Sequence, residues 1–370
     1  MKRETPIKIA HIIGKWNGGG VESVVMNYYR HIDRTKYKFD FVCDSDSTSI
    51  PYDEIKKMGG RVILVPPYQK VFEYHIGLKK ILKEGEYQIV HSHINALSVF
   101  SLYAAKRAGI PVRIAHSHST SNKKEPLKNI FKFILKPFSR MFATDYMACT
   151  EHAGRWLFGD KEFDSGNVFI LNNAIDVEKF KYNEEIRIKK RRELCIAEDT
   201  FVIGHIGRFV EQKNHRFLID IFYKFHCEYP NSILLLIGQG PLMKEIKERV
   251  MLLGLQESVH FLGQRDNISD FYQVFDLFLF PSLYEGLGMV MIEAQCSGLP
   301  CVASTDVPVD SKINNNVSYL SLDSRIEDWT EEISRMIQSQ REINYQLMNI
   351  SGYDIQTEAL KLEEKYKSFL

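Results

Sequence analysis

"FVIGHIGRFVEQKNHRFLIDIFYKFHCEYPNSILLLIG", Phe201 to Gly238, shows two short apolar runs separated by a longer stretch with helical spacing. The runs are FVIGHI and SILLLI, and the stretch between them is NHRFLIDIFYKFHCEYP. Continuous apolar strands on either side of a helix are typical of a parallel sheet that is covered on both faces. The segment therefore predicts a strand, a crossover helix and a second, parallel strand.

The same alternation continues in both directions from this unit. Downstream runs are VHFLG, DLFLFPS and PCVAS, and upstream runs are IKIAHII, FDFVC, RVILVP, YQIVHSH, VRIAHSH, DYMACT and VFILNN. A charged stretch, residues 178–200, separates the two series and reads as a linker. We predict an α/β protein of two doubly wound domains, residues 1–180 and 181–345, with a C-terminal helix over 346–370 that packs back on the first domain. A ligand shared by two such sheets lies in the cleft between them.

Composition narrows the class of protein. The 370 residues are 44% hydrophobic and 26% charged, and 48 basic residues face 47 acidic ones, which argues against a global electrostatic hold on nucleic acid. No signal peptide and no apolar run of about 20 residues is present, so we expect a cytoplasmic protein. The six cysteines show no CxxC pairs, which favours reduced thiols over disulfides or metal ligands.

The stretch YEGLGMVMIEAQCSGLPCV, Tyr284 to Val302, sets Glu285 and Glu293 eight residues apart around a Gly-Leu-Gly turn. Glu285 follows a strand and Glu293 falls within the next helix, so they do not share one helical face. The turn Gly286-Leu287-Gly288 allows close backbone approach to a ligand, and a helix that begins there directs its positive end at an anion. A phosphorylated, polyhydroxylated ligand would satisfy these features together. A helix-terminal acid plus a surface glutamate is the structural alternative.

A second loop, GRFVEQKNH, places Gly207, Arg208 and Lys213 after the strand FVIGHI. Two cations beside a helix N-terminus suit a diphosphate. The alternative is that Arg208 and Lys213 are solvated charges on the surface. The stretch LIGQGPLM contains Gly238 but has Met243 where a dinucleotide fingerprint has its third glycine, so this match is weak.

A family resemblance rests on several of these stretches in order. GRFVEQKN, LLLIGQGPLMKEI, VHFLGQRDNISDFY and PSLYEGLGMVMIEAQCSGLPCVAS resemble the second domain of the retaining, nucleotide-sugar-dependent group 1 glycosyltransferases of capsule, exopolysaccharide and lipopolysaccharide synthesis. Glu285 and Glu293 match their E-x7-E motif. GKWNGGGVESVVMNYYRHI, IVHSHIN, GIPVRIAHSHS, ACTEHAG and LNNAIDVEKF match the first domain more loosely. The family has the GT-B fold, two Rossmann-like domains that face each other across a cleft.

The resemblance implies a role for each site residue. Arg208 and Lys213 would neutralise the donor diphosphate, Glu293 would hold the ribose, and Glu285 with the backbone of residues 286–288 would hold the donor sugar. The loop Gly18-Gly19-Gly20 should face the donor from the first domain. We expect a uridine diphosphate-linked sugar as donor substrate, a saccharide or lipid-linked acceptor, no cofactor and no metal ion.

His116 and His118, in RIAHSHS, are the candidates for the family's active-site histidine. The sequence leaves both open; His116 is the preferred catalytic residue, and His118 then lines the donor site. His91 and His93, in VHSHIN, are expected to support the wall.

The stretch over residues 123–140 combines cations at every fourth position with bulky apolar residues; the cations are Lys124, Lys128, Lys132, Lys136 and Arg140. On a helix this pattern favours peripheral contact with anionic lipid headgroups on the inner face of the plasma membrane. A domain helix with solvated lysines is the alternative.

Three functions fit this pattern. The first is a retaining hexosyltransferase of cell-surface polysaccharide synthesis. A nucleotide-sugar epimerase of the same architecture would convert a donor without an acceptor, and a two-lobed sugar-binding protein would need no catalysis.

Overall fold

The computed structural model describes residues 5–118, 135–138 and 140–370, and its chain divides into two compact units. Unit 1 comprises residues 1–175 and 352–370, and unit 2 comprises residues 176–351. Sequence reasoning placed the corresponding boundaries after residues 180 and 345. Each unit contains one parallel sheet with helices packed on it, so the predicted α/β class with two doubly wound domains is confirmed.

Unit 1 is built on a seven-stranded sheet of order β3-β2-β1-β4-β5-β6-β7. Its strands are β1 (Ile7–Gly14), β2 (Tyr37–Asp44), β3 (Arg61–Val65), β4 (Ile89–Ser92), β5 (Val112–Ser117), β6 (Asp145–Ala148) and β7 (Val168–Ile170). Its helices are α1 (Gly20–His31), α2 (Tyr52–Lys57), α3 (Val71–Glu84), η1 (Asn95–Leu97), α4 (Ser98–Ala108), α6 (Glu151–Phe158), α7 (Asp160–Asp164) and α16 (Ile355–Lys367).

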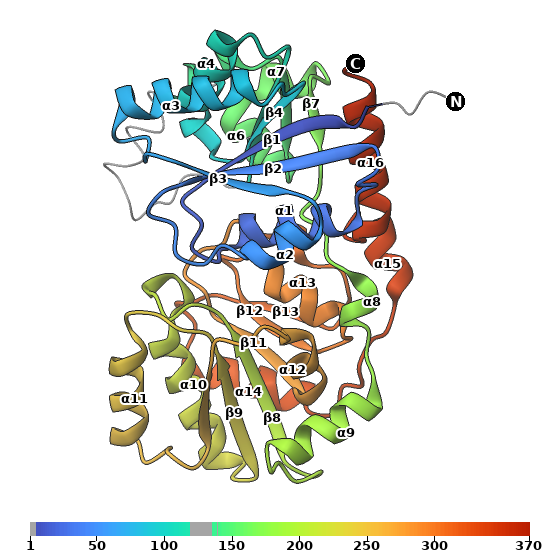
Figure 1. Cartoon of the computed structure of the whole chain (residues 1–370). Helices are drawn as coiled ribbons and strands as arrows, with labels where there is room; N and C mark the ends of the chain where they lie inside the picture. The colour runs from blue at the N-terminus through green and yellow to red at the C-terminus, as the bar shows by residue number, and fades with distance from the viewer. Residues whose placement is uncertain (1–4, 119–134, 139) are drawn as a thin grey trace. The chain divides into compact units, whose positions relative to one another are not determined.

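The two faces of this sheet are covered differently. Helices α3 and α4 lie on one side of the sheet in Figure 1. Their residues Leu78 and Leu102 belong to one apolar cluster with the strand residues Ala10, Val90 and Ala115. Alternate residues point to the other face, where α1 and α16 pack around Phe39. The histidines of β1, β4 and β5 lie on this second face, because His11 and His91 are register partners and stack close to His93 and His116.

Helix α16 returns the chain to unit 1 and is fixed there by polar contacts. Glu358, fully buried, accepts a hydrogen bond from the Asn172 N–H at 3.3 Å. Glu363 accepts one from the Asp33 N–H at 2.7 Å, and the Tyr37 hydroxyl donates to the Glu363 carbonyl at 2.8 Å. The buried Tyr366 ring completes the contact with the sheet.

Unit 2 is built on a six-stranded sheet of order β10-β9-β8-β11-β12-β13. Its strands are β8 (Phe201–Ile206), β9 (Ser232–Ile237), β10 (Val259–Gly263), β11 (Leu277–Phe280), β12 (Cys301–Ser304) and β13 (Val317–Leu320). Its helices are α8 (Val177–Phe180), α9 (Glu184–Glu193), η2 (Glu211–Lys213), α10 (His215–Glu228), α11 (Met243–Leu252), α12 (Ile268–Val274), α13 (Met289–Cys296), η3 (Val309–Ser311), α14 (Ile326–Met336) and α15 (Tyr345–Ile350).

In both sheets the first strand of the unit lies in the middle, and the strand order reverses beside it. The reversal falls between β1 and β4 in unit 1 and between β8 and β11 in unit 2. Loops at the carboxyl ends of these strands diverge to opposite sides, which leaves a crevice where open α/β sheets bind ligands. The fold therefore points to one such position in each unit.

Candidate active site

The two predicted cationic site residues, Arg208 and Lys213, follow β8 at the point where the strand order reverses. Arg208 lies two residues after the strand and is exposed, and Lys213 ends the short helix η2 just before α10 begins. Because β11 pairs directly with β8, the loop that carries Glu285 starts at the neighbouring strand end. The topology thus brings together residues that are more than seventy positions apart in the sequence.

Lys213 and Glu285 form a largely buried ion pair. The Lys213 Nζ lies 2.7 Å from Glu285 Oε1, and the two side chains are 15% and 7% exposed. The same ammonium lies 4.7 Å from the centre of the Phe280 ring, and Gln212 donates a second hydrogen bond to the Glu285 carboxylate. A cation held between a carboxylate and an aromatic face is positioned before any ligand arrives.

Glu293 lies on α13 and is contacted from α12. Its carboxylate accepts a hydrogen bond from the Tyr272 hydroxyl at 2.7 Å. Desolvation raises the pKa of Glu293 to about 7, and the hydrogen bond from Tyr272 lowers it only in part. Since the side chain keeps partial exposure, its free oxygen lone pairs remain available to hydroxyl groups of a ligand.

The Gly-Leu-Gly turn leads directly into α13. Gly288 caps the helix with φ of +84°, and a Cβ there would lie 3.2 Å from the Phe280 ring. Leu287 is buried, so its side chain belongs to the core, and only its backbone can face a ligand. Among the described residues, the backbone N–H groups of 286–288 have no hydrogen-bond partner. They are free to bind an anion beside the helix N-terminus.

Two further glycines of unit 2 have a structural explanation. Gly238 has φ of +139°, and a Cβ there would lie 2.0 Å from the Gly207 carbonyl oxygen. Gly207 in turn would place a Cβ 3.1 Å from the Lys213 side chain. These glycines let the loops after β8 and β9 pack backbone to backbone, which fixes the loop that carries Arg208.

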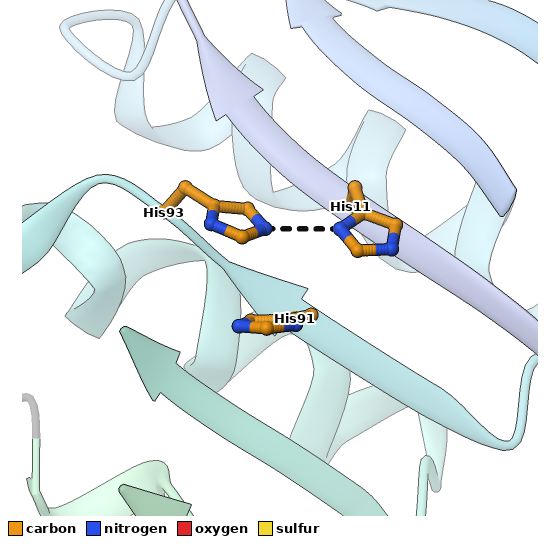
Figure 2. A group of neighbouring side chains, drawn as sticks. All are labelled: His11, His91 and His93. Atoms are coloured by element: carbon orange, nitrogen blue, oxygen red, sulfur yellow. Dashed lines mark hydrogen bonds between the residues drawn. The ribbon is translucent and has the colours of Figure 1, made fainter. Parts of the chain in front are cut away.

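The sequence-predicted histidines of unit 1 belong to a cluster of five buried imidazoles, which we call the histidine cluster: His11, His91, His93, His116 and His118. His11 Nδ1 and His93 Nε2 lie 2.9 Å apart, and Figure 2 shows these rings pointing at each other with His91 beside them. His93 Nδ1 and His118 Nε2 are 2.8 Å apart, and His91 Nε2 and His116 Nδ1 are 2.9 Å apart. His91 and His93, expected as wall residues, thus contact both candidate active-site histidines.

Burial keeps the histidine cluster neutral. Desolvation lowers the pKa of His11 to about 3 and that of His118 to about 4, and it also lowers the pKa values of His91, His93 and His116 well below the ordinary range. Two triplets, His11–His91–His93 and His93–His116–His118, hold ligand nitrogens within 4.8 Å, a spacing that could hold a metal ion. One nitrogen pair in each triplet is hydrogen-bonded, His11–His93 in the first and His93–His118 in the second, so a proton lies between the two nitrogens of that pair.

The loop Gly18-Gly19-Gly20 leads from β1 into α1 at the other reversal point. Gly18 has φ of +71°, and Gly19 caps the helix. The carboxylate of Glu22, a nearly buried residue, accepts a hydrogen bond from the Asn17 N–H at 3.0 Å and lies 2.8 Å from where a Gly19 Cβ would be. This carboxylate already supplies negative charge at the α1 N-terminus, which disfavours a phosphate there and favours hydroxyl groups.

The sequence interpretation missed several of these residues. Tyr272, Phe280 and Gln212 each contact a predicted site residue, and Glu22 shapes the glycine loop. Only Glu22 had a local signal, as an acid in the first turn of a helix that follows glycines. Most of the predicted membrane segment, residues 123–134 and 139, lies outside the described residues. Within the described ranges, no helix is long and apolar enough to cross a membrane.

Family models and known proteins match both halves of the chain. The family model of group 1 glycosyl transferases matches residues 186–350, and the model of glycosyltransferase family 4 matches residues 18–179. EpsF of Bacillus subtilis (strain 168), which is named as a glycosyltransferase, is 36% identical over 365 residues, 94% of this chain and 93% of that protein. The chain belongs to the group 1 glycosyltransferases.

Two other proteins are similar to most of the chain. A protein of Escherichia coli is 26% identical over 80% of the chain and 79% of its own length; it is named UDP-Gal:alpha-D-GlcNAc-diphosphoundecaprenol alpha-1,3-galactosyltransferase. The crystal structure of Anabaena HepE in complex with UDP and glucose has a TM-score of 0.81 and 20% identity, over 98% of this chain and all of that one. This likeness confirms the predicted GT-B fold class.

Proposed function

We propose that the protein is a retaining glycosyltransferase of cell-surface polysaccharide synthesis. It transfers a hexose or N-acetylhexosamine from a UDP-linked sugar to a saccharide or lipid-linked acceptor. The observation that carries this proposal is the group of Arg208, Lys213 and Glu285 at the strand-order reversal of the unit 2 sheet. The UDP found in HepE and the UDP-galactose and lipid diphosphate in the name of the E. coli relative support the choice of substrates.

Arg208 and Lys213 are assigned to the donor diphosphate. When the bond between sugar and phosphate breaks, negative charge grows on the departing diphosphate, and fixed cations stabilise that charge in the transition state. Arg208 is exposed and can bind phosphate oxygens bidentately, whereas Lys213 acts as a point charge. The free backbone N–H groups before α13 add neutral donors to the same anion.

Glu285 is assigned to the sugar hydroxyls. Its carboxylate already accepts from Lys213 and Gln212, so its position is fixed before the sugar binds. A carboxylate oxygen has further lone pairs and accepts from hydroxyl groups while the ion pair persists. Binding energy spent on the sugar then orients its anomeric carbon relative to the diphosphate.

Glu293 is assigned to the ribose of the nucleotide. An ionised carboxylate accepts hydrogen bonds from both hydroxyls of a diol, and the Tyr272 hydroxyl holds one of its oxygens in place. Because burial raises its pKa to about 7, the ionised form needs a donor partner to be favoured. The ribose diol supplies two such donors.

We infer that the anomeric configuration is retained by a mechanism that uses no protein nucleophile. The acceptor hydroxyl attacks the face from which the diphosphate leaves: the new bond joins its oxygen to C1, and the bond from C1 to the phosphate oxygen breaks. The hydroxyl proton passes to the departing diphosphate. In this scheme the side chains of unit 2 stabilise charge and orient the sugar.

The segment 123–140 is proposed to dock on anionic lipid headgroups close to a lipid-linked acceptor. Its regular cations and apolar residues support this assignment. Flotation with anionic and with neutral vesicles tests it. Loss of binding in the variant Lys128→Glu/Lys132→Glu is expected, and unchanged flotation of that variant would contradict the assignment.

The enzymatic proposal is tested in two steps. Thermal shift against UDP-glucose, UDP-galactose, UDP-N-acetylglucosamine and GDP-mannose should reveal stabilisation by at least one UDP-sugar, because a ligand that binds only the folded state raises its melting temperature. Proton NMR of the transfer product should then show the anomeric configuration of the donor. Stabilisation by no nucleotide sugar, or a product of inverted configuration, would refute the proposal.

A further inference from the structure

A buried hydrogen-bonded chain links α16 to His116 within unit 1. The Tyr366 hydroxyl lies 2.7 Å from His91 Nδ1, and His91 Nε2 lies 2.9 Å from His116 Nδ1. The three side chains are at most 2% exposed. At the far end, His116 Nε2 is a buried atom without a hydrogen-bond partner among the described residues. We call Tyr366 the closed end of this hydrogen-bonded chain, and His116 Nε2, which lacks a partner among the described residues, its open end.

The closed end determines where the protons lie. The Tyr366 hydroxyl has a single proton, and His91 Nδ1 is its one acceptor within the described part of the chain. If His91 Nδ1 donated instead, the hydroxyl proton and the His116 Nε2 lone pair would both be buried without partners among the described residues, whereas donation by Tyr366 leaves only the His116 Nε2–H group without one. Tyr366 therefore donates, and His91 Nδ1 carries the lone pair.

The remaining protons follow in sequence. A neutral imidazole has one ring proton, so His91 carries it on Nε2 and donates it to His116 Nδ1. His116 then carries its own proton on Nε2, at the open end. Burial keeps both rings neutral, which excludes the doubly protonated form.

We propose that Tyr366 is a positioning residue that fixes His116 in the Nε2–H tautomer, so that this imidazole offers a substrate oxygen a hydrogen-bond donor and not a basic lone pair. The part that concerns substrate rests on the proposed function; the tautomer itself does not. A residue near the C-terminus of the chain thereby sets the chemical character of a candidate active-site group on β5. His116 then orients or polarises an oxygen and does not remove a proton from the acceptor.

The tautomer is measured directly by long-range proton–nitrogen correlation NMR on the full chain labelled with 15N-histidine. Single histidine-to-glutamine variants assign the signals. In the unmodified protein, Nε2 should be the protonated nitrogen of both His91 and His116. A protonated Nδ1 on His116 would overturn the proposal, because it requires Tyr366 to accept.

Substitutions then test the cause. Tyr366→Phe removes the donor and should convert His116 to a mixture of tautomers or to the Nδ1–H form. The matched control is Tyr37→Phe: Tyr37 is also buried, its ring centre lies 6.0 Å from that of Tyr366, and its hydroxyl donates to a backbone carbonyl away from the histidines. The control should leave the His116 signals unchanged. Identical His116 signals in Tyr366→Phe and the unmodified protein would also overturn the proposal.

A second pair of variants covers the case in which Tyr366→Phe does not fold. The glutamine amide of His91→Gln can donate to His116 Nδ1 and should preserve the Nε2–H tautomer, whereas His91→Leu should lose it. The opposite pattern would contradict the relay. Turnover adds a separate readout: Tyr366→Phe should lower kcat about tenfold or more, with the affinity for UDP unchanged, because the residues assigned to UDP lie in unit 2. If the unmodified protein transfers no sugar, the proposed function fails and the NMR result still stands.

Discussion

Replacement of Glu293 by glutamine should stabilise the ligand-free protein at pH 8 while it weakens donor binding. Burial raises the pKa of Glu293 from 4.5 to about 7. The folded state therefore holds this proton more tightly than the unfolded chain, so stability falls as the pH rises from 4.5 to 7 and the full cost is present above pH 7. A shift of this size corresponds to about 3 kcal/mol, which we reduce to about 2 kcal/mol because the side chain is partly exposed.

Glutamine does not ionise, and its amide oxygen still accepts from Tyr272. For a unit of this size, about 2 kcal/mol corresponds to a rise of roughly 4–8 °C in melting temperature. Differential scanning calorimetry at pH 8 and pH 5 should show the gain at pH 8 and little of it at pH 5. Calorimetric titration should show weaker binding of UDP.

Glu332 on α14 provides a control of opposite sign. Its hydrogen bond with Arg335 lowers the pKa of this carboxyl, so stability from this pair is present at pH 8 and is lost as the pH falls. Glu332→Gln should therefore destabilise the protein at pH 8. A Glu293→Gln variant no more stable than the unmodified protein at pH 8, or one with the same gain at pH 5, would refute the reasoning.

Three other predictions concern unit 2. Lys213→Met leaves the 7%-exposed Glu285 carboxylate without its cation and should lower the free energy of unfolding in urea by about 3 kcal/mol. The double variant Lys213→Met/Glu285→Gln should recover stability but not sugar transfer. A double variant as unstable as the single one would argue against the ion pair. Arg208→Ala should weaken UDP binding at least about tenfold without a change in melting temperature. The control Arg192→Ala, which removes an exposed cation on α9, should bind UDP normally. Equal UDP affinities of the two variants would exclude Arg208 from the site. Gly238→Ala forces a Cβ to 2.0 Å from the Gly207 oxygen and should lower the melting temperature far more than the control Gly254→Ala. At Gly254 φ is +70° but the space around a Cβ is open, so that substitution should lower the free energy of unfolding by only about 1–2 kcal/mol. A similar fall in melting temperature in both variants would contradict the packing of the two loops.

The strands were readable from the sequence because parallel strands covered on both faces are continuous apolar runs, such as SILLLI and LFLF. The edge strand β13 escaped prediction because VSYL is short, and three of its four residues are only partly buried. The stretch from Asp328 to Ile350 has the spacing that is typical of terminal helices. It is broken between α14 and α15, where Glu342 hydrogen-bonds with the loop after α13. A break of this kind depends on tertiary contacts that local spacing does not reveal.

The site residues were predictable to the extent that topology places them. Lys213 and Glu285 meet because the loops that carry them follow β8 and β11, which are neighbouring strands. The contact of Tyr272 with Glu293 depends on how α12 packs on α13, which helical spacing alone does not give. The pairs His91–His93 and His116–His118 each have a spacing of two, which places each pair on one face of its strand. Nothing local connects them to Tyr366, 250 positions after His116.

The discontinuous make-up of unit 1 affects the order in which the two halves can be completed during synthesis. Residues 176–351 leave the ribosome as an uninterrupted block, whereas the first sheet must wait for residues 352–370 before α16 can cover Phe39 and His91. Unit 1, whose synthesis begins first, is therefore the second unit to complete its fold. Nascent chains should gain protease resistance over 176–351 before they gain it over 5–118, and a short C-terminal deletion should expose the beginning of the protein.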